Sequence, residues 1–599
     1  MAFQDFDYIS ERRKNEQKQK AKNRIMIGVV LFLAVLVLIA AAACAYVYIN
    51  RNSAADGKTG KHSTNHPNPA KDKAAHAKDD GNAATLKAVK MLCSSTDYIQ
   101  TCQDSLSKYI GSNATASKQP KDLLQAAISV VSAELQKVYD KVSTMNFDTP
   151  ELKGAFEDCK VLFQDAKDEL NSSVSSVHQQ TTTSLSSSTP DLNNWLSAVM
   201  SYQETCIDGF PDGDVKTSMN TSLQSVKELT SNSLAIVNQV SGLFSAVNFG
   251  ASRRLLDHDG LPSWMSDEDR RMLKRKDKSK DKSLVPNVTV ALDGSGQFKT
   301  ISDALAAMPT AYEGRYNIYV KEGIYQEYPI VSKNMINVTI YGDGSQKSVV
   351  TGNKNFVDGV RTFQTATFTV LGDGFMAQSI GFKNTAGGEK HQAVAIRVQA
   401  DRSVFLNCRM EGYQDTVYAQ THRQFYRGCL ITGTVDFIFG DAASIFQNCV
   451  MYIMKPLDNQ QTIVTAQGRI DKRETTGIVL QNCKILADKG FEEDKMKFKN
   501  YLGRPWKEYS RTIVMESEIG ELIDPAGWMP WEGDFALNTL YYAEYANTGP
   551  GAKTDSRVKW AGYKGIISKT EAQKYTVTPF LQGDTWLDSN TKVRFGLSS

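Results

Sequence analysis

Hydrophobic positions in the first half of the chain recur with the period of an α-helix. Within residues 86–249 apolar side chains return at steps of three or four residues, as in Leu124, Ile128, Val131, Leu135, Val138 and Val142. Similar stripes cover residues 152–177, 192–206 and 215–240. Pro150 and Pro190 stand near expected helix starts. Several amphipathic helices joined by short loops predict an all-α, antiparallel four-helix bundle at 86–249.

The second half, residues 286–599, carries short β-branched runs separated by Gly, Asn and Asp in place of long stripes. Cys408, Cys429 and Cys449 recur at nearly equal intervals. Three asparagines each precede a cysteine: Asn407, Asn448 and Asn482. A period near 20 in an all-β segment predicts the stacked coils of a parallel β-helix, and a β-sandwich with coincidental spacing is the alternative.

The coil period also places candidate chemistry. Equivalent positions in adjacent coils lie about 4.8 Å apart, which predicts a disulfide between Cys429 and Cys449. Asp415 and Asp436 stand one such period apart, so their carboxyls are expected in adjacent coils on one face. Two such neighbours cannot both ionise at their ordinary pKa, and the pair would supply an acid beside a nucleophile or base. Structural turn caps are the alternative.

The N-terminal segments predict entry into the secretory pathway. Ile25 to Ile49 form 25 consecutive positions without a charge, more than the roughly 20 that cross a bilayer as a helix. A basic tail at 1–24 should stay cytoplasmic. We expect a transmembrane signal-anchor helix at 25–49, with a cleaved signal peptide as the alternative. Residues 50–85 are expected to form a flexible linker.

Composition narrows the possible partners only a little. The net charge of +3 neither favours nor excludes a polyanion, and nothing points to nucleic acid. Seven histidines lack ligand spacing and no Gly-x-Ser-x-Gly motif occurs, so we expect no metal, no cofactor and no serine triad. Five glycosylation acceptors agree with a secretory compartment: Asn113, Asn171, Asn220, Asn287 and Asn337.

Cysteines in the bundle suggest disulfides. Pairing Cys93 with Cys102 and Cys159 with Cys206 would fasten a hairpin and tie two helices together, although four cysteines permit three connectivities. A second linker at 250–285 contains two dibasic motifs, Arg253 to Leu256 and Arg270 to Leu273. Such motifs in an exposed segment suit cleavage by a processing protease.

Sequence blocks in the second half resemble the signature blocks of plant pectin methylesterases. The most specific are GYQDTVY at 412–418, DFIFG at 436–440 and LGRPW at 502–506. Further matches at 294–298, 319–323, 362–368, 391–395 and 464–469 follow in the family's order. The bundle with four cysteines is similar to the pectin methylesterase inhibitor domain, which forms a pro-region in such enzymes, and a helical spacer is the alternative.

The resemblance implies a right-handed parallel β-helix that removes methyl esters from homogalacturonan. It implies Asp436 as nucleophile, Asp415 as proton donor, and Gln392 with Gln414 as oxyanion donors. It also implies that Arg504 orients Asp436 and that Thr362 and Trp506 bind substrate. Tyr418 and Phe437 could wall the groove, with core packing as the alternative for Phe437. Asp441 stands where the family commonly has Asn, so we expect Asp441→Asn to alter the pH profile.

The same resemblance predicts how the chain matures. A subtilisin-like protease would cut at the two dibasic motifs, the bundle would act as an intramolecular inhibitor until then, and the mature enzyme would reach the cell wall. Two other functions stay open. A pectin lyase or hydrolase could share the β-helix, but the glutamine-flanked aspartates favour ester cleavage. A non-catalytic pectin-binding or inhibitor protein is disfavoured because the matched catalytic positions are intact.

Overall fold

The computed structural model describes residues 86–112, 120–180, 185–248, 284–587 and 592–598. The expected cytoplasmic tail, signal-anchor and first linker lie outside these residues, as do both dibasic motifs. Among the helices that the structure describes, none combines the length and the apolar character needed to cross a bilayer.

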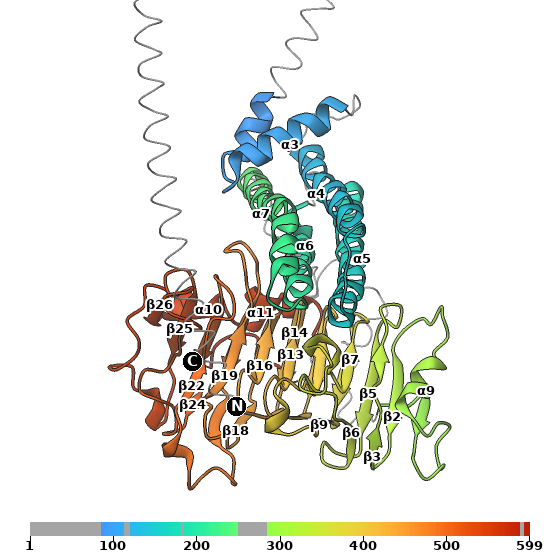
Figure 1. Ribbon diagram of the computed structural model, residues 1–599, viewed down its shortest axis with the longest axis vertical. Coiled ribbons are helices and arrows are strands. Elements are labelled where there is room, and N and C mark those ends of the chain that lie inside the picture. The colour runs from blue at the N-terminus through green and yellow to red at the C-terminus, as the bar shows by residue number, and fades with distance from the viewer. Residues whose placement is uncertain (1–85, 113–119, 181–184, 249–283, 588–591, 599) are drawn as a thin grey trace, which may run out of the picture. The chain divides into compact units, whose positions relative to one another are not determined.

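Long helices form the first region (Figure 1). They are α3 (Ile99–Ser112), α4 (Pro120–Val142), α5 (Pro150–Gln179), α6 (Leu185–Asp208) and α7 (Asp214–Asn248). Helices α4 to α7 form a closed bundle, because α5 and α7 each pack against both α4 and α6. All six members of the stripe that predicts α4 are buried in the bundle core.

Local signals set the helix boundaries only in part. The Thr149 hydroxyl accepts a hydrogen bond from the Leu152 amide at 3.2 Å, and Pro150 occupies the first helical turn as predicted. Pro190 instead lies inside α6, which begins at Leu185. Disulfides join Cys93 to Cys102 and Cys159 to Cys206, with Cα atoms 5.7 and 4.7 Å apart. The structure thereby selects one of the three possible connectivities.

Residues 284–587 form a parallel β-helix with three sheets, and the strands of each sheet follow one another in space in the order given below. The eleven-stranded sheet contains β1 (Val288–Val290), β2 (Tyr316–Val320), β5 (Val338–Gly342), β8 (Met376–Gln378), β11 (Ser403–Leu406), β14 (Arg423–Arg427), β17 (Ala443–Gln447), β20 (Gly477–Gln481), β23 (Arg511–Met515), β25 (Tyr541–Tyr545) and β26 (Tyr563–Ile566). The seven-stranded sheet contains β22 (Asn500–Gly503), β19 (Thr462–Gln467), β16 (Ile438–Gly440), β13 (Val417–Ala419), β10 (Ile396–Val398), β7 (Phe368–Val370) and β4 (Ile330–Val331). The eight-stranded sheet contains β24 (Glu518–Ile519), β21 (Lys484–Ala487), β18 (Val450–Ile453), β15 (Leu430–Gly433), β12 (Arg409–Glu411), β9 (Gly381–Asn384), β6 (Ser348–Gly352) and β3 (Gly323–Gln326).

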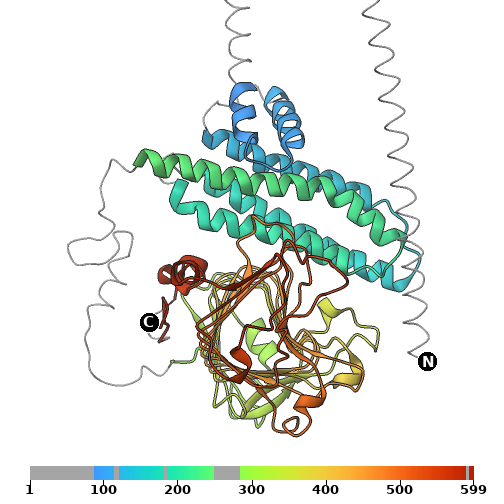
Figure 2. The ribbon, with the colours of Figure 1, turned by 90° about the vertical axis from the view of Figure 1, so that its left-hand side faces the viewer.

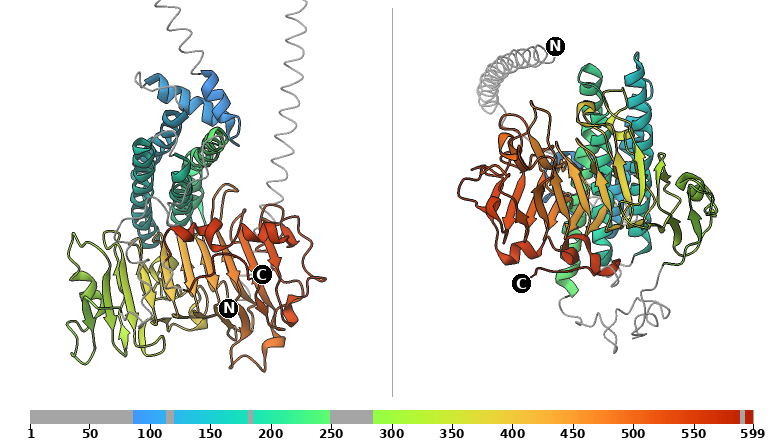
Figure 3. Two further views of the ribbon diagram at one scale, coloured as in Figure 1. Left: turned by 180° about the vertical axis from the view of Figure 1, so that it is seen from behind. Right: turned by 90° about the horizontal axis from the view of Figure 1, so that it is seen from below.

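Short helices lie between and after the strands of the β-helix. They are α9 (Ile301–Ala306), α10 (Lys569–Gln573) and α11 (Val577–Leu581), with 3-10 turns η1 (Thr362–Gln364), η2 (Gly388–Lys390), η3 (Lys495–Lys497), η4 (Pro550–Ala552) and η5 (Gly583–Thr585). Figure 2 looks nearly along the stack, so that successive coils superpose, and Figure 3 shows the same coils following one another from green to red.

A single left-handed residue bends successive coils between the eleven-stranded and eight-stranded sheets from β11 to β21. Asn407, Asn448 and Asn482 have φ of 52°, 57° and 54°, and Gly428 takes the same place with φ of 64°. Asparagine and glycine tolerate this conformation better than other residues do. The asparagine repeat in the sequence therefore corresponds to a turn that recurs in these successive coils.

The expected disulfide between Cys429 and Cys449 is wrong, since both cysteines are free thiols buried in the core, with Cys408 and Cys483. Strands β15 and β18 pair in parallel register from Leu430 and Val450 onward, so equivalent side chains point the same way. Their Cβ atoms then stay near the coil spacing of about 4.8 Å, longer than the roughly 3.8 Å of a disulfide. The Cys429 thiol instead donates to the Phe405 carbonyl at 3.5 Å.

Candidate active site

Asp415 and Asp436 occupy equivalent positions in adjacent coils. Each lies two residues before a strand of the seven-stranded sheet, and those strands pair Val417 with Ile438. Both aspartates have left-handed backbones, with φ of 62° and 50°, and the Asp415 amide donates to the Val435 carbonyl at 3.1 Å. The coil arithmetic of the sequence therefore predicts their placement correctly.

The two carboxyls are buried in different electrostatic settings. Asp415 is 8% exposed and Asp436 is 5% exposed. Burial, and then the negative charge of Asp436, raise the pKa of Asp415 well above its ordinary value, while Arg504 opposes them. This shift favours the protonated form of Asp415 over the ionised form.

Arg504 grips Asp436 with two nitrogens. Its Nε lies 2.9 Å from Oδ1 and its Nη2 lies 2.6 Å from Oδ2 of Asp436. This forked, charge-assisted contact favours the ionised carboxylate. The guanidinium also lies over the ring of Trp531, 4.2 Å from its centroid. The sequence did not identify Trp531 as a candidate site residue, although it follows Trp528 closely in a motif with two tryptophans.

Gln392 and Gln414 lie side by side, joined by an isolated parallel bridge between adjacent coils. The Ala393 amide donates to the Gln414 carbonyl at 3.2 Å, which fixes the backbones of both glutamines. Both glutamines are half-buried, directly before the buried segments that begin at Ala393 and Asp415. Thr362 lies in η1, one residue after Arg361 and one before Phe363.

Aromatic side chains form an outer cluster on the seven-stranded sheet. Tyr418 and Phe439 stack with ring centroids 4.3 Å apart, and Trp506 meets Phe439 edge to face at 5.9 Å. Phe363 and Trp531 border the same cluster. Phe437 is fully buried in the interior core, so of the two interpretations for this residue core packing is the right one.

Two glycines permit this close packing. Gly440 has a φ of 125°, and a Cβ there would lie 1.9 Å from the Ala419 carbonyl oxygen. A Cβ at Gly468 would lie 2.8 Å from the Trp506 ring. Both positions need the absence of a side chain.

A second acid pair, Asp441 and Glu474, lies in the adjoining interior. Asp441 Oδ1 accepts from Thr476 Oγ1 at 2.5 Å and from Gln467 Nε2 at 3.0 Å, while Glu474 Oε1 accepts from the Asp471 amide at 2.7 Å. The other oxygens, Asp441 Oδ2 and Glu474 Oε2, are buried without a donor. Burial raises the pKa of Asp441 to about 6, and burial together with the charge of Asp441 raises the pKa of Glu474 well above its ordinary value, so the pair favours holding a proton.

The bundle contacts the neighbours of the candidate site. Thr205 lies 3.4 Å from the Tyr418 hydroxyl, and Glu204 and Asp208 lie 2.8 and 2.7 Å from Lys507, the residue after Trp506. Asp158 lies 2.5 Å from Arg361, which precedes Thr362. Helices α5 and α6 therefore cover the side of the sheet that carries the aromatic cluster.

The fold is the parallel β-helix of a class of carbohydrate esterases. Residues 287–584 match the family model described as Pectinesterase, and residues 87–236 match Plant invertase/pectin methylesterase inhibitor. The chain belongs to the pectinesterase family, whose members are carboxylic ester hydrolases, and carries an inhibitor-like domain ahead of the catalytic one.

Relatives of both regions support the assignment. The chain is 55% identical to an Arabidopsis thaliana protein named probable pectinesterase/pectinesterase inhibitor 13, over 85% of this chain and 82% of that one. It is 41% identical to pectinesterase 1 of Citrus sinensis over 85% of this chain and 88% of that one. The solved pectin methylesterase from carrot superposes with a TM-score of 0.52 at 49% identity, covering 53% of this chain and 99% of its own.

Proposed function

We propose that this chain hydrolyses the methyl esters of homogalacturonan through an aspartate acyl-enzyme, with Asp436 as nucleophile and Asp415 as acid and base. The observation that carries the proposal is the asymmetry of the pair. Arg504 binds both oxygens of Asp436, whereas burial and the charge of Asp436 raise the pKa of Asp415. One carboxyl is therefore ready to attack while the other is ready to donate a proton.

The reaction takes two balanced steps. An Asp436 oxygen attacks the ester carbonyl carbon, and as the tetrahedral intermediate collapses the C–O bond to methoxide breaks while Asp415 supplies the proton that makes methanol. In the second step Asp415, now ionised, takes a proton from water as the water attacks the acyl-enzyme. The acyl bond to Asp436 breaks, which restores both aspartates and releases the galacturonate as its acid, and this acid then loses its proton to the solvent.

Side chains around the pair complete the proposed site. The side-chain amides of Gln392 and Gln414 donate to the oxyanion of each tetrahedral intermediate, where one donor is typically worth about 3 kcal/mol. Trp506 offers an apolar face to a sugar ring, and Thr362 directly precedes Phe363, which packs against the same aromatic cluster. Trp531 joins the proposal through its contact with Arg504.

We further propose that the bundle inhibits the enzyme until a subtilisin-like protease cuts at Arg253 to Leu256 or Arg270 to Leu273. Its contacts on Tyr418, Lys507 and Arg361 support this, because they lie over the side chains that would meet the polymer. The two disulfides favour an oxidising route. The mature enzyme would then act on methyl-esterified pectin in the cell wall, after passage through the secretory pathway.

Methanol release from highly esterified pectin tests both parts. The intact chain should release methanol slowly and the chain cut in the 250–285 linker much faster, while solution viscosity holds because no glycosidic bond breaks. Asp436→Asn should abolish release in both forms. Equal rates before and after cutting would remove the inhibitory role, and a fall in viscosity would replace the esterase with a depolymerase.

A further inference from the structure

Ion pairs between the bundle and the β-helix all have the same polarity. In every such pair among the described residues the bundle supplies the carboxylate and the β-helix supplies the cation. The pairs are Asp158 with Arg361, Asp165 and Asp168 with Lys333, Glu169 with His422, Asp191 with Arg423, Glu204 and Asp208 with Lys507, and Asp97 with Lys472 and Arg473. A contact selected only for adhesion has no need for a single polarity.

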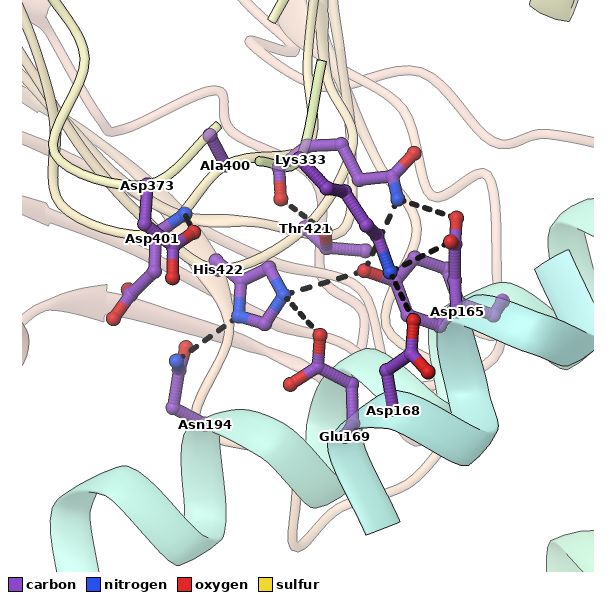
Figure 4. A network of polar contacts seen from close by, with 12 residues as sticks. Asp165, Asp168, Glu169, Asn194, Lys333, Asp373, Ala400, Asp401, Thr421 and His422 are labelled. Atoms are coloured by element: carbon purple, nitrogen blue, oxygen red, sulfur yellow. Dashed lines mark hydrogen bonds and ion pairs between the residues drawn. The ribbon is translucent and has the colours of Figure 1, made fainter. Parts of the chain in front are cut away.

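Figure 4 shows the centre of this contact, where Lys333 lies between Asp165 and Asp168, at 2.6 and 3.1 Å. His422 faces Glu169 at 3.3 Å and Asn194 at 3.0 Å nearby. A cavity of about 250 Å³ opens among these groups, lined by Asp168, Lys333 and His422 with others. Charged groups therefore line the contact between the two regions here.

Three cations of this face have carboxylate partners only on the bundle. Within the described ranges, Lys333, Arg361 and Lys507 form no ion pair with an acid of the β-helix. Cations elsewhere on the β-helix behave differently, since Lys383 pairs with Glu411 and Lys484 with Glu518 of the same region. The covered cations are thus left without partners of their own when the bundle leaves.

Arg397 is a fourth cation on this face and lacks an ion pair altogether in the part of the chain described. It lies on the outer face of the seven-stranded sheet, opposite Tyr418 in register, and is 6% exposed. Its Nη1 donates to the Gln399 and Gln420 side chains at 3.2 and 2.9 Å, while its Nε and the Gln420 Nε2 are buried without an acceptor. Two buried donors beside the aromatic cluster therefore have no acceptor, and an anion would supply one.

We infer that Lys333, Arg361, Arg397 and Lys507 form a binding row for the free carboxylates of de-esterified galacturonate, and that the bundle's acids occupy this row as mimics of that polyanion. The inference rests on the proposed function, since ester hydrolysis is what creates carboxylates on the polymer. It adds a second substrate feature: the enzyme holds a chain of mixed esters and acids by the acids that flank the ester being cut.

The position of the row fits this role. Arg361 immediately precedes Thr362, Lys507 immediately follows Trp506, and Arg397 is aligned with Tyr418 across adjacent strands. The cations therefore flank Asp415 and Asp436 on both sides along the stack of coils. A row of one sign in a groove concentrates a polymer of the opposite sign, and adding salt weakens that attraction.

The test measures binding of de-esterified hexagalacturonate to the full chain and to a loosened chain, Asp158→Asn/Asp165→Asn/Asp208→Asn. These near-isosteric changes leave both bundle disulfides in place. The loosened chain should bind at least about tenfold more tightly than the parent, with strong salt dependence. Adding Arg397→Gln and Lys507→Gln should reverse the gain, whereas the matched change Lys383→Gln/Lys484→Gln on the opposite sheet should not. Equal weakening by the two double changes would overturn the inference.

Hydrogen exchange in the unsubstituted chain provides a second measurement that needs no variant to fold. De-esterified hexagalacturonate should accelerate exchange in α5 and α6 by competing for the row, and the fully methyl-esterified hexamer should do so less. Equal acceleration by both oligomers, or none by either, overturns the inference. Methanol release by the chain cut in the 250–285 linker separates the two levels: no release means that the proposed function fails, while release together with cation-independent binding by the loosened chain means that only the row fails.

Discussion

Two acid pairs lie close together in this protein, and they differ in what surrounds them. The pair of Asp415 and Asp436 has Arg504 on one member, so its two carboxyls lie in different electrostatic settings. The pair of Asp441 and Glu474 accepts hydrogen bonds from neutral donors on both members. Two neighbouring acids therefore do not make a catalytic pair by themselves. A cation that separates their proton affinities, and access for substrate, are also required.

The most direct test of this difference between the two pairs is to neutralise one acid of each pair. Asp436→Asn removes the nucleophile and should lower kcat by about 10⁴-fold or more. The same chemical change at Asp441, five residues on, should leave turnover at alkaline pH nearly intact and alter only its pH profile. Methanol release by the processed chain measures both. A comparable loss from Asp441→Asn would mean that the two pairs act as one unit.

Arg504→Gln should turn the first pair into a copy of the second. Without the cation, Asp436 loses the forked contact that orients it, and kcat/KM should fall by about 10²- to 10³-fold. The alkaline limb of the pH–rate profile should move to higher pH, because Arg504 opposes the rise in the pKa of Asp415 and its removal lets that pKa rise further. Arg504→Lys keeps the charge without the fork and should lie between the two. An unmoved alkaline limb in Arg504→Gln would argue against this assignment.

The first pair could be predicted from the sequence because the coils that carry it are regular. Successive coils here are nearly equal in length, so the matching intervals of the two aspartates and of Cys408 and Cys429 were sufficient. Family blocks then pointed to Arg504, Gln392 and Gln414. Spacing also led to one error, since it predicts that two cysteines lie in adjacent coils but not the parallel direction of their side chains.

The second pair gives no signal of this kind. Ala443 pairs with Gly477 in the next coil, a longer step than the one from Arg423 to Ala443, because an irregular loop at 468–476 lengthens that coil. Glu474 reaches Asp441 from this loop, and no period in the sequence predicts that approach. The sequence also does not predict the contacts between the bundle and the β-helix, since each contact pairs residues more than 150 positions apart.

The pH dependence of stability sharpens the comparison further. The folded pKa of Asp441 is about 6, against an ordinary 3.8, so the protonated acid contributes stability that is complete below about pH 4 and lost as pH rises through 6. A shift of this size corresponds to roughly 3 kcal/mol. Asp441→Asn supplies a permanent donor to Glu474 and should remove most of that loss.

Urea unfolding of parent and Asp441→Asn at pH 4 and pH 8 measures this difference. The parent should lose stability between the two values, and the variant should lose less. Glu474→Gln serves as the matched change on the other member and should act in the same direction, because burial and the charge of Asp441 raise the pKa of Glu474 as well. Parallel curves for all three proteins would show that no proton is shared.

Thr476→Val should have the smallest effect and probes how the second pair is held. The Thr476 hydroxyl donates to Asp441 at 2.5 Å, and its loss should raise the pKa of Asp441 further. Because the donor stabilises the ionised carboxylate most, the cost should be about 1 kcal/mol at pH 8 and smaller at pH 4. Thr421→Val is the control, since that hydroxyl donates to the neutral Gln399 carbonyl at 3.1 Å. Its cost should not change with pH, and an equal pH dependence in both variants would assign the effect to cavity formation rather than to the charge on Asp441.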